Sequence, residues 1–404
     1  MQFPQPLYTE LKHHVDALAL EMREWETNWS VDEDESRKIA SMVRVFSHTI
    51  KLCNITIAGV DGDGDFPSVA YGDSLIYFTQ SWTTCYKSVP IDGLKEVSLI
   101  YPYLMELTML PSETSACRIA VDQAFRKLAN TDISEVIERS DYRILKARVS
   151  GKANTQVSLI NGLIRPHATD SGNIAVQLRA TGELGIALRQ LQGPIEFDYL
   201  LIDGTLSLPF VNRAQDSLFY EYLKRLCCVE ARKHNVGLFA LSRSHGFPSI
   251  EPIEEIVQAK LGYEEGKAAE HWYMRVPMGD IDGWELSLTR GHRIPPPGAV
   301  TYLIRFHKTM PVLRLDMDRE YWIEHIYRAS REETSANEQR IFEHLDYISH
   351  DPRSSGYPYP LAAAHNRASL TQKQRQFLRE QIIENAVNAG LKRALFRNTT
   401  QVTG

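Results

Sequence analysis

The sequence has few cysteines, and their spacing excludes a disulfide framework. The 404 residues include five cysteines, at positions 53, 85, 117, 227 and 228, and no two of them form a CxxC pair. An odd number of cysteines without a secretion signal argues against stabilising disulfides. The opening residues, MQFPQPLYTELKHHVDALALEMREWE, lack a basic start followed by an apolar core, so they do not resemble a signal peptide. We therefore expect a cytoplasmic protein with reduced thiols.

Long apolar runs and several catalytic motifs are also missing. No segment approaches 18 consecutive apolar residues, so we expect no membrane-spanning helix and no membrane partner. There is no GxxxxGKS/T phosphate loop, which argues against ATP hydrolysis by this chain. Neither a GxSxG elbow nor an HExxH helix occurs, which argues against the chemistries that those motifs support.

The charge balance is slightly acidic. The chain has 45 Lys and Arg residues against 51 Asp and Glu residues, a formal net charge of −6. This total gives no sign of nucleic-acid binding, although a local basic groove matters more than the sum. Local basic pairs occur at Lys224/Arg225, Arg232/Lys233 and Arg290/Arg293. We expect at least half of them to be solvated faces of helices and loops.

The pattern of apolar residues predicts an α/β chain whose central sheet mixes antiparallel and parallel strands. A β-branched run at 55–60 and a second strand at 74–82 open a β-meander. Later, the strand FDYLLIDG, a long helix and the strand VGLFALSRS form a βαβ unit, so these two strands should be parallel. A hairpin is expected to turn near 308–310.

Two acidic residues stand at the ends of apolar strands. The stretch IAGVDGDGDF places Asp61 at the carboxyl end of its strand, and Asp203 ends the strand YLLID. Ligands gather at such strand ends in sheets covered by helices, so the two carboxylates should meet above one sheet edge. Glu183 starts the helix before the Asp203 strand, and a short loop could return Asp203 to its vicinity. Carboxylates in this arrangement suit Mg²⁺ or Mn²⁺.

Simpler explanations exist for these aspartates. An Asp-Gly pair after a strand is most often a turn. The string Asp61, Asp63 and Asp65 also suggests a calcium loop, but that template needs Gly at its sixth position and Glu at its twelfth. This chain has Phe66 and Gly72 at those positions. We interpret Asp63 and Asp65 as solvated turn residues in preference to auxiliary ligands.

A further candidate lies in the segment SSGYPYPLAAAHNRASLT. Tyr357, Pro358 and Pro360 form a stiff, extended approach to a helix that contains His365. A histidine there could ligate a metal, protonate a leaving oxygen or contact phosphate. The alternative is a histidine that is only hydrogen-bonded at a helix start.

Five segments together resemble the motifs of the NurA family of nucleases. In order they are IAGVDGDGD, Glu183, LLIDGTLSL, LFALSRS and GYPYPLAAAH. The resemblance implies an RNase H-like core with a mixed central sheet flanked by helices. It also implies a homodimer that acts on DNA with Mn²⁺, together with a HerA-type hexameric ATPase translocase.

The resemblance further implies a metal site with two ions, Mn²⁺ or Mg²⁺. Its ligands would be Asp61, Glu183 and Asp203. Glu183 has no distinctive neighbours, so Glu106 and Glu113 remain alternatives to it. A metal-bound water, its pKa lowered, would attack the phosphorus.

The same resemblance assigns catalytic roles to Arg243 and His365. His365 matches the family's C-terminal histidine and would orient phosphate or aid the leaving group. Arg243 stands where the family usually has a lysine; it can hold phosphate but cannot release a proton at working pH. Tyr357 is expected to contact substrate beside it.

The resemblance predicts a single nuclease domain over residues 1–404. Its parts are an N-terminal helical region (1–50), an RNase H-like core (51–245), an insertion (246–298), and a C-terminal hairpin with helices (299–404). We expect a metal-dependent DNA nuclease that acts in DNA end processing (repair) or antiviral defence. The alternative is a catalytically inactive adaptor for the translocase or DNA, which the lysine-to-arginine departure favours.

Overall fold

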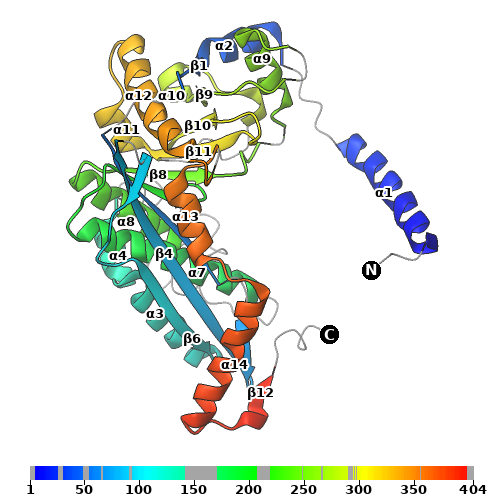
Figure 1. Cartoon of the computed structure of the whole chain (residues 1–404), viewed down its shortest axis with the longest axis vertical. Coiled ribbons are helices and arrows are strands. Elements are labelled where there is room, and N and C mark those ends of the chain that lie inside the picture. The colour runs from blue at the N-terminus through cyan, green and yellow to red at the C-terminus, as the bar shows by residue number, and fades with distance from the viewer. Residues whose placement is uncertain are drawn as a thin grey trace, which may run out of the picture. The chain divides into compact units, whose positions relative to one another are not determined.

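The computed structural model of the protein describes most of the chain. The described residues are 5–25, 31–48, 54–64, 67–90, 93–141, 171–206, 219–247, 249–264, 267–289, 294, 296, 298–354 and 356–397. They fold as an α/β protein around one 12-stranded sheet (Figure 1), which confirms the predicted fold class. No helix within these ranges is both long and apolar enough to cross a membrane.

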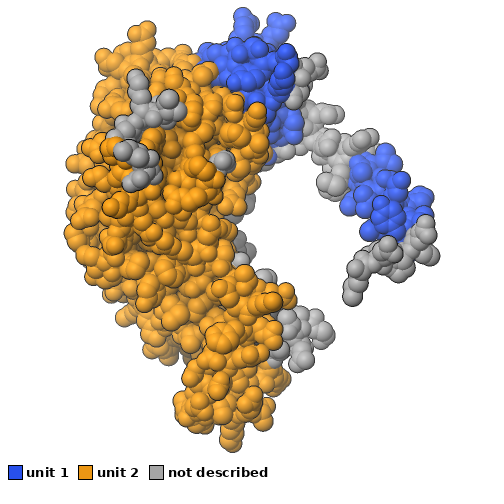
Figure 2. All heavy atoms as spheres, in the orientation of Figure 1, with its two compact units in different colours: residues 1–43, 246–269, 277–292 blue, residues 44–245, 270–276, 293–404 orange. Residues whose placement is uncertain are grey.

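The chain divides into two compact units, which Figure 2 colours separately. Unit 1 consists of residues 1–43, 246–269 and 277–292, and unit 2 of residues 44–245, 270–276 and 293–404. Most of the expected insertion therefore groups with the N-terminal residues. The four-part layout drawn from the sequence stays a prediction.

Unit 1 is helical in its described part. Its elements are α1 (Gln5–Trp25), α2 (Glu33–Met42), α9 (Glu251–Leu261), α10 (Gly279–Asp282) and the 3-10 turn η2 (Ser287–Thr289). Helix α2 begins after Asp32, whose side chain caps it by accepting a hydrogen bond from the Glu35 backbone N–H at 2.8 Å. The Glu35 carboxylate accepts bonds from Ser287 N and Oγ, both at 2.7 Å, and so joins α2 to η2.

The strands of the sheet belong to unit 2, except that Val43, the first residue of β1, belongs to unit 1. They are β1 (Val43–Val45), β2 (Thr56–Asp63), β3 (Pro67–Tyr71), β4 (Ser74–Val89), β5 (Gly93–Glu96), β6 (Tyr103–Leu110), β7 (Tyr199–Asp203), β8 (Gly237–Ser242), β9 (Trp272–Arg275), β10 (Ala299–Arg305), β11 (Leu313–Asp318) and β12 (Phe396–Arg397). The hairpin predicted near 308–310 is confirmed, because β10 pairs antiparallel with β11 across that turn.

The helices of unit 2 lie between and after these strands. They are α3 (Thr114–Ala129), α4 (Ile133–Arg139), α7 (Ser171–Gln192), α8 (Phe219–Lys233), α11 (Arg319–His325), α12 (Arg331–Ser349), α13 (Tyr359–Ala368), α14 (Gln372–Asn388) and the 3-10 turn η3 (Arg393–Leu395).

The centre of the sheet has the strand order β6–β4–β2–β7–β8. The first three strands are antiparallel neighbours, and β7 and β8 run parallel to β2. The predicted βαβ unit is therefore confirmed, with α8 connecting β7 to β8. Three antiparallel strands followed by two parallel ones form an RNase H-like sheet. Strand β11 then continues the sheet antiparallel to β8.

Helix α7 covers one face of this centre and packs against α3 and α8 as well as β2 and β4. It passes very close to α3, because a Cβ atom added to Gly185 would lie 1.9 Å from the Leu128 carbonyl oxygen. Only glycine allows that approach. The apolar residues Leu184, Ile186 and Leu188 are all buried, which explains why α7 has no clear polar face.

Helix α13 packs directly on β2. A Cβ atom added to Gly59 would lie 2.5 Å from the backbone carbon of Pro360. The Thr84 hydroxyl of β4 donates a hydrogen bond to the Pro360 carbonyl at 2.6 Å. Side chains alternate along a strand, so Gly59 and Asp61 point to the α13 face and Gly62 points to the opposite face, toward α7.

Candidate active site and a histidine cluster

Asp61 and Asp203 lie side by side at the carboxyl ends of two parallel strands. The register pairs Val60 of β2 with Ile202 of β7, so the two aspartates that follow are neighbours. Asp61 is buried; Asp203 keeps part of its surface exposed, although the surrounding residues remove part of its water. The structure thus brings together the two carboxylates that the sequence singles out.

The two carboxylates influence each other electrostatically. Loss of surrounding water raises the pKa of Asp203, and the negative charge of Asp61 raises it further. Arg243, His365 and Arg179 oppose this rise from the same neighbourhood. Two like charges held this closely favour either a proton or a cation between them.

His365 reaches this edge from α13. Its Nδ1 atom lies 2.6 Å from Asp61 Oδ2, and its Nε2 atom lies 3.3 Å from the Ser369 hydroxyl. The other oxygen of Asp61, Oδ1, accepts a hydrogen bond from the Gly62 backbone N–H at 2.7 Å. Asp61 is therefore held from both sides, which fixes the direction of its remaining lone pairs.

Glu183 approaches from α7 on the other face of β2. A Cβ atom added to Gly62 would lie 3.0 Å from Glu183 Oε1, so the carboxylate rests against that glycine. Arg179, one turn earlier, has its Nε atom 3.5 Å from the same oxygen. The two alternatives to Glu183 have other partners: Glu106 bonds Lys127 at 2.8 Å, and Glu113 caps α3.

Arg243 follows the last residue of β8, the parallel strand beside β7. Its guanidinium carbon lies 4.8 Å from the centre of the Tyr357 ring, a cation–π contact. Tyr357 is buried, which raises the pKa of its hydroxyl, and Asp203 raises it further. The Tyr357 phenol is thus neutral at ordinary pH. Its ring contacts the Arg243 guanidinium near the Asp61 and Asp203 carboxylates.

Asp63 is not the solvated turn residue that the sequence analysis expects, and that interpretation is wrong. Its side chain is buried and accepts from Arg375 Nη2 at 2.6 and 2.7 Å and from the Leu370 backbone N–H at 2.8 Å. It ties the loop between α13 and α14 to β2. Asp65 lies outside the described residues.

In the two described basic pairs the arginines are not solvated faces, whereas Lys233 is exposed. Arg225 is buried, with Nε 2.9 Å from Asp141 Oδ1 and Nη1 2.8 Å from Asp318 Oδ1. Arg232 joins the same network through Nη2, 3.1 Å from Asp141 Oδ2. These two arginines form ion pairs with Asp141 and Asp318 inside the protein, so they are not available to bind nucleic acid. The pair at 290 and 293 lies outside the described residues.

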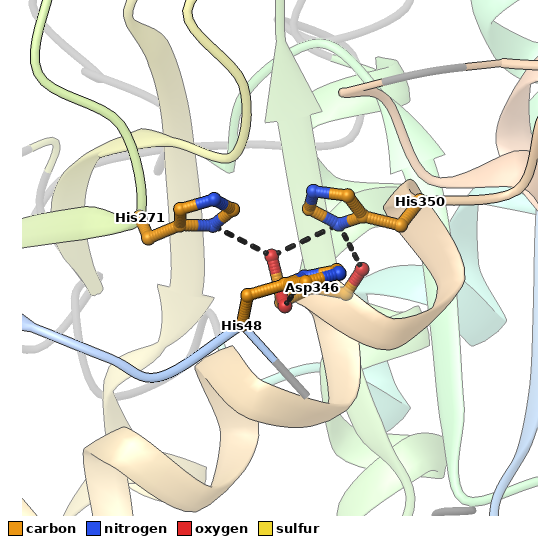
Figure 3. Close-up of side chains that lie close together, drawn as sticks. All are labelled: His48, His271, Asp346 and His350. Carbon is orange, nitrogen blue, oxygen red and sulfur yellow. Dashed lines mark hydrogen bonds and ion pairs between the residues drawn. The ribbon is translucent and has the colours of Figure 1, made fainter. Parts of the chain in front are cut away.

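Three histidines surround Asp346 in another part of unit 2 (Figure 3). The Nδ1 atoms of His48, His271 and His350 lie 2.9, 3.3 and 3.1 Å from its carboxylate oxygens. Burial alone would raise the pKa of Asp346, but hydrogen bonds from the histidines hold it well below its usual range. Each of the four side chains offers a ligand atom, and these atoms all lie within 4.8 Å of one another.

The sequence analysis missed this cluster. Asp346 and His350 stand four residues apart on α12, which is a local signal for a shared helix face. His48 follows β1 and His271 precedes β9, so only the folded sheet brings them to α12. No spacing motif connects these three segments.

Comparisons with known proteins find solved structures that match at low sequence identity. No protein-family model and no curated protein matches the chain. One match is a structure of the NurA nuclease from Sulfolobus solfataricus. The alignment covers 96% of this chain and 99% of the NurA chain at 12% identity, with a TM-score of 0.48. NurA with manganese covers 95% and 99% at 11% identity, with a TM-score of 0.37. NurA bound to dAMP and manganese covers 96% and 98% at 12% identity, with a TM-score of 0.37.

Proposed function

We propose that this chain is a metal-dependent deoxyribonuclease of the NurA type. One observation carries the proposal: Asp61 and Asp203 lie together at the ends of parallel strands, with the cation Arg243 on the next strand. A pair of carboxylates beside a fixed guanidinium can hold a hard cation and a phosphate at adjacent positions. The order of the sequence motifs supports the same assignment.

The donor set fits Mn²⁺ or Mg²⁺. Asp61, Asp203 and Glu183 offer carboxylate oxygens, which hard divalent cations prefer. The raised pKa of Asp203 points the same way, because a cation would offset the repulsion from Asp61. When bound, such an ion supplies a Lewis acid and a water of lowered pKa for attack on phosphorus. We propose two ions, with Asp61 and Asp203 as the shared ligands; Glu183, which lies against Gly62 on the other face of β2, would complete the second site.

The remaining residues position and neutralise the substrate. Arg243 donates to the non-bridging oxygens of the scissile phosphate, and Tyr357 holds the guanidinium in place through its ring. His365 orients Asp61 through Nδ1 and exchanges a proton with the leaving oxygen. Because arginine keeps its proton, the proton transfer is assigned to His365 and water.

The proposal includes DNA as substrate, a HerA-type hexameric ATPase as partner, and a homodimer. The surface of β6 supports a protein partner. On its outward face Tyr103, Met105, Leu107 and Met109 are all exposed, while the alternate side chains face the core. A row of four apolar side chains on one strand is typical of an interface. The cellular setting would be DNA end processing or defence against foreign DNA.

The test is cleavage of end-labelled linear single- and double-stranded DNA in Mn²⁺, Mg²⁺ or EDTA. We expect metal-dependent cleavage that is lost in Asp203→Asn and Glu183→Gln. Glu106→Gln is the matched control. Glu106 lies on β6 and accepts a bond from Lys127 of α3, so this variant should keep full activity. Cleavage that persists in Asp203→Asn would contradict the proposal.

A second candidate function is a non-catalytic adaptor, favoured by Arg243 in the place of the family's lysine. The adaptor would show no cleavage in any metal, with or without an added translocase. It also need not gain thermal stability from Mn²⁺ at the strand ends. A rise in Tm with Mn²⁺ that is smaller in Asp203→Asn than in the unmodified protein would favour the nuclease.

A further inference from the structure

The cluster around Asp346 combines donors that belong to a different metal chemistry from the strand ends. Three imidazole nitrogens converge on one carboxylate, as Figure 3 shows. Nitrogen donors of this kind suit zinc and other late transition metals, whereas Mg²⁺ and Mn²⁺ favour oxygen. We propose that His48, His271, His350 and Asp346 bind one zinc-class ion, independently of the proposed nuclease function.

The distances from the three histidine nitrogens to the Asp346 carboxylate agree with a small tetrahedral ion. Bonds of about 2.0–2.1 Å to a tetrahedral zinc set its ligand atoms roughly 3.3 Å apart. The three contacts from Nδ1 to the Asp346 oxygens measure 2.9, 3.3 and 3.1 Å. Three histidines and one carboxylate complete four-coordination, so this ion would need no water and would be structural.

The rings are already packed against one another before any ion binds. The centres of the His48 and His350 rings are 3.8 Å apart, and His271 lies 5.2 Å from each. The Phe46 backbone N–H donates to the His271 carbonyl at 3.0 Å, and its buried ring packs edge-on against the His271 ring. These contacts fix the segments that carry two of the ligands.

A further carboxylate stands behind the cluster. Glu270 Oε2 lies 4.0 Å from His271 Nε2, the ring nitrogen that faces away from Asp346. Metal-binding histidines commonly present their second nitrogen to a carboxylate, which fixes the tautomer and makes the ligand more basic. Glu270 is itself held by the Lys308 backbone N–H at 3.1 Å.

The cluster also has a route to solvent. The Asp346 side chain is fully buried, whereas 37% of the His48 side chain is exposed. An ion could therefore enter past His48 without unfolding the site. Once bound, it would link the end of β1, the start of β9 and the last turn of α12, three segments far apart in sequence.

The competing explanation is a metal-free cluster in which three neutral imidazoles donate to one carboxylate. A carboxylate has enough lone pairs to accept all three bonds, so hydrogen-bond satisfaction does not decide between the two. They differ in metal content. The experiment must therefore measure binding at this cluster while the strand-end carboxylates are disabled.

We would strip the Asp203→Asn full-length protein with a chelator, return one to three equivalents of Zn²⁺, and measure retained zinc after gel filtration. Co²⁺ serves as a spectroscopic probe, since its visible absorption reports a tetrahedral nitrogen and oxygen site. The variants are His48→Gln and His350→Gln in the same background. His344→Gln is the matched control, because His344 lies on α12 but bonds the Tyr199 hydroxyl at 3.0 Å.

We expect one equivalent of zinc, a tetrahedral Co²⁺ spectrum and a rise in Tm with Zn²⁺ in the background protein and in His344→Gln. His48→Gln and His350→Gln should bind at least about ten-fold more weakly and lose the Tm rise. If His350→Gln does not fold, His48→Gln tests the same zinc site, because His48 is the most exposed of the four ligands and its replacement should disturb folding least. Zinc retention below one-tenth of an equivalent, or equal retention in His48→Gln, would overturn the proposal.

Discussion

His365 Nδ1 and Asp61 Oδ2 lie 2.6 Å apart although 304 positions separate the two residues in the chain. The contact joins the middle of α13 to the carboxyl-terminal part of β2. If Asp61 binds the metal, His365 becomes the residue that sets the direction of its carboxylate. Several consequences of this arrangement can be measured.

His365→Ala should weaken metal binding as well as turnover. Removing the partner of a ligating carboxylate typically costs about 10–100-fold in metal affinity or activity. The measurement is cleavage rate against Mn²⁺ concentration. His365→Gln is the comparison, because its amide can still donate to Asp61 and should retain more of the metal affinity. Identical Mn²⁺ dependence in the unmodified protein and His365→Ala would show that the contact does not orient the ligand.

Asp203→Asn should stabilise the metal-free protein while abolishing cleavage. The pKa of Asp203 is raised in the folded state by burial and by Asp61, so the folded protein holds this proton more tightly than the unfolded chain. Ionisation therefore costs stability as the pH rises from the unfolded value through the raised one, and the cost is fully present above it. In EDTA at pH 7 we expect a Tm gain on the order of 2 °C.

That gain should shrink as the pH falls through the raised pKa of Asp203, where the carboxylate takes up its proton. Excess Mn²⁺ should reverse the order of the two proteins, because only the unmodified site gains an ion. Glu106→Gln, which removes a carboxylate that has a lysine partner, should show no gain. A lower Tm for Asp203→Asn in EDTA at pH 7 would refute the electrostatic account.

Gly59→Ala should disturb the candidate site through the packing of α13 on β2. The new methyl group would meet Pro360 backbone atoms at 2.5 and 2.7 Å, and backbone cannot move aside as a side chain can. Such overpacking costs about 1–3 kcal/mol and should displace α13 together with His365. We expect lower Tm and lower activity by thermal unfolding and cleavage assay.

Gly193→Ala provides a matched control for that substitution. Its added methyl group would meet the Arg189 carbonyl oxygen at 3.4 Å, an ordinary contact. It should leave both Tm and activity close to those of the unmodified protein. Equal effects of the two substitutions would mean that the close packing of α13 on β2 is not what Gly59 preserves.

Arg375→Ala should destabilise the protein without changing the metal stoichiometry. It leaves the buried carboxylate of Asp63 with the Gly64 and Leu370 backbone N–H groups but without its cation, and an underpaired buried acceptor costs about 1–3 kcal/mol. Chemical denaturation measures the loss, and Lys373→Ala, an exposed change on the same helix α14, is the control. A loss of bound Mn²⁺ in Arg375→Ala would instead make Asp63 part of the metal site.

Arg243 can be tested by graded substitution. Arg243→Ala should lower cleavage by roughly 10²–10³, the usual effect of removing a donor to transition-state charge. Arg243→Lys keeps the charge but loses the bidentate geometry and the stacking on Tyr357, so we expect an intermediate rate. Tyr357→Phe keeps the ring and should change little. A lysine variant as inactive as alanine would show that geometry, not charge, is required.

The sequence reveals most of the sheet centre for a clear physical reason. The three parallel strands β2, β7 and β8 contain short apolar runs, a pattern that predicts buried strands. β9 was not predicted, because the four residues Trp272–Arg275 carry no period of their own and become a strand only by pairing with β10. The buried role of Asp63 was missed for a similar reason, since its partner Arg375 is remote in sequence.

The candidate sites differ in how visible they are. Asp61 and Asp203 can be found in the sequence because each follows an apolar run of strand residues. The parallel register of β2 and β7 then brings them together. The histidine cluster depends on segments around 48, 271 and 346–350 that only the folded sheet assembles. Sequence patterns report periodicity within an element well, and they report contacts between remote elements poorly.

The packing of α13 on β2 also bears on how the protein is made. The ribosome releases β2, β7 and β8 long before α13, so an emerging chain carries the strand-end carboxylates without His365 or the Tyr357 ring. Gly59 leaves a bare strip of backbone that only α13 fills. The complete candidate site therefore exists only after α13 has been synthesised and has packed on β2.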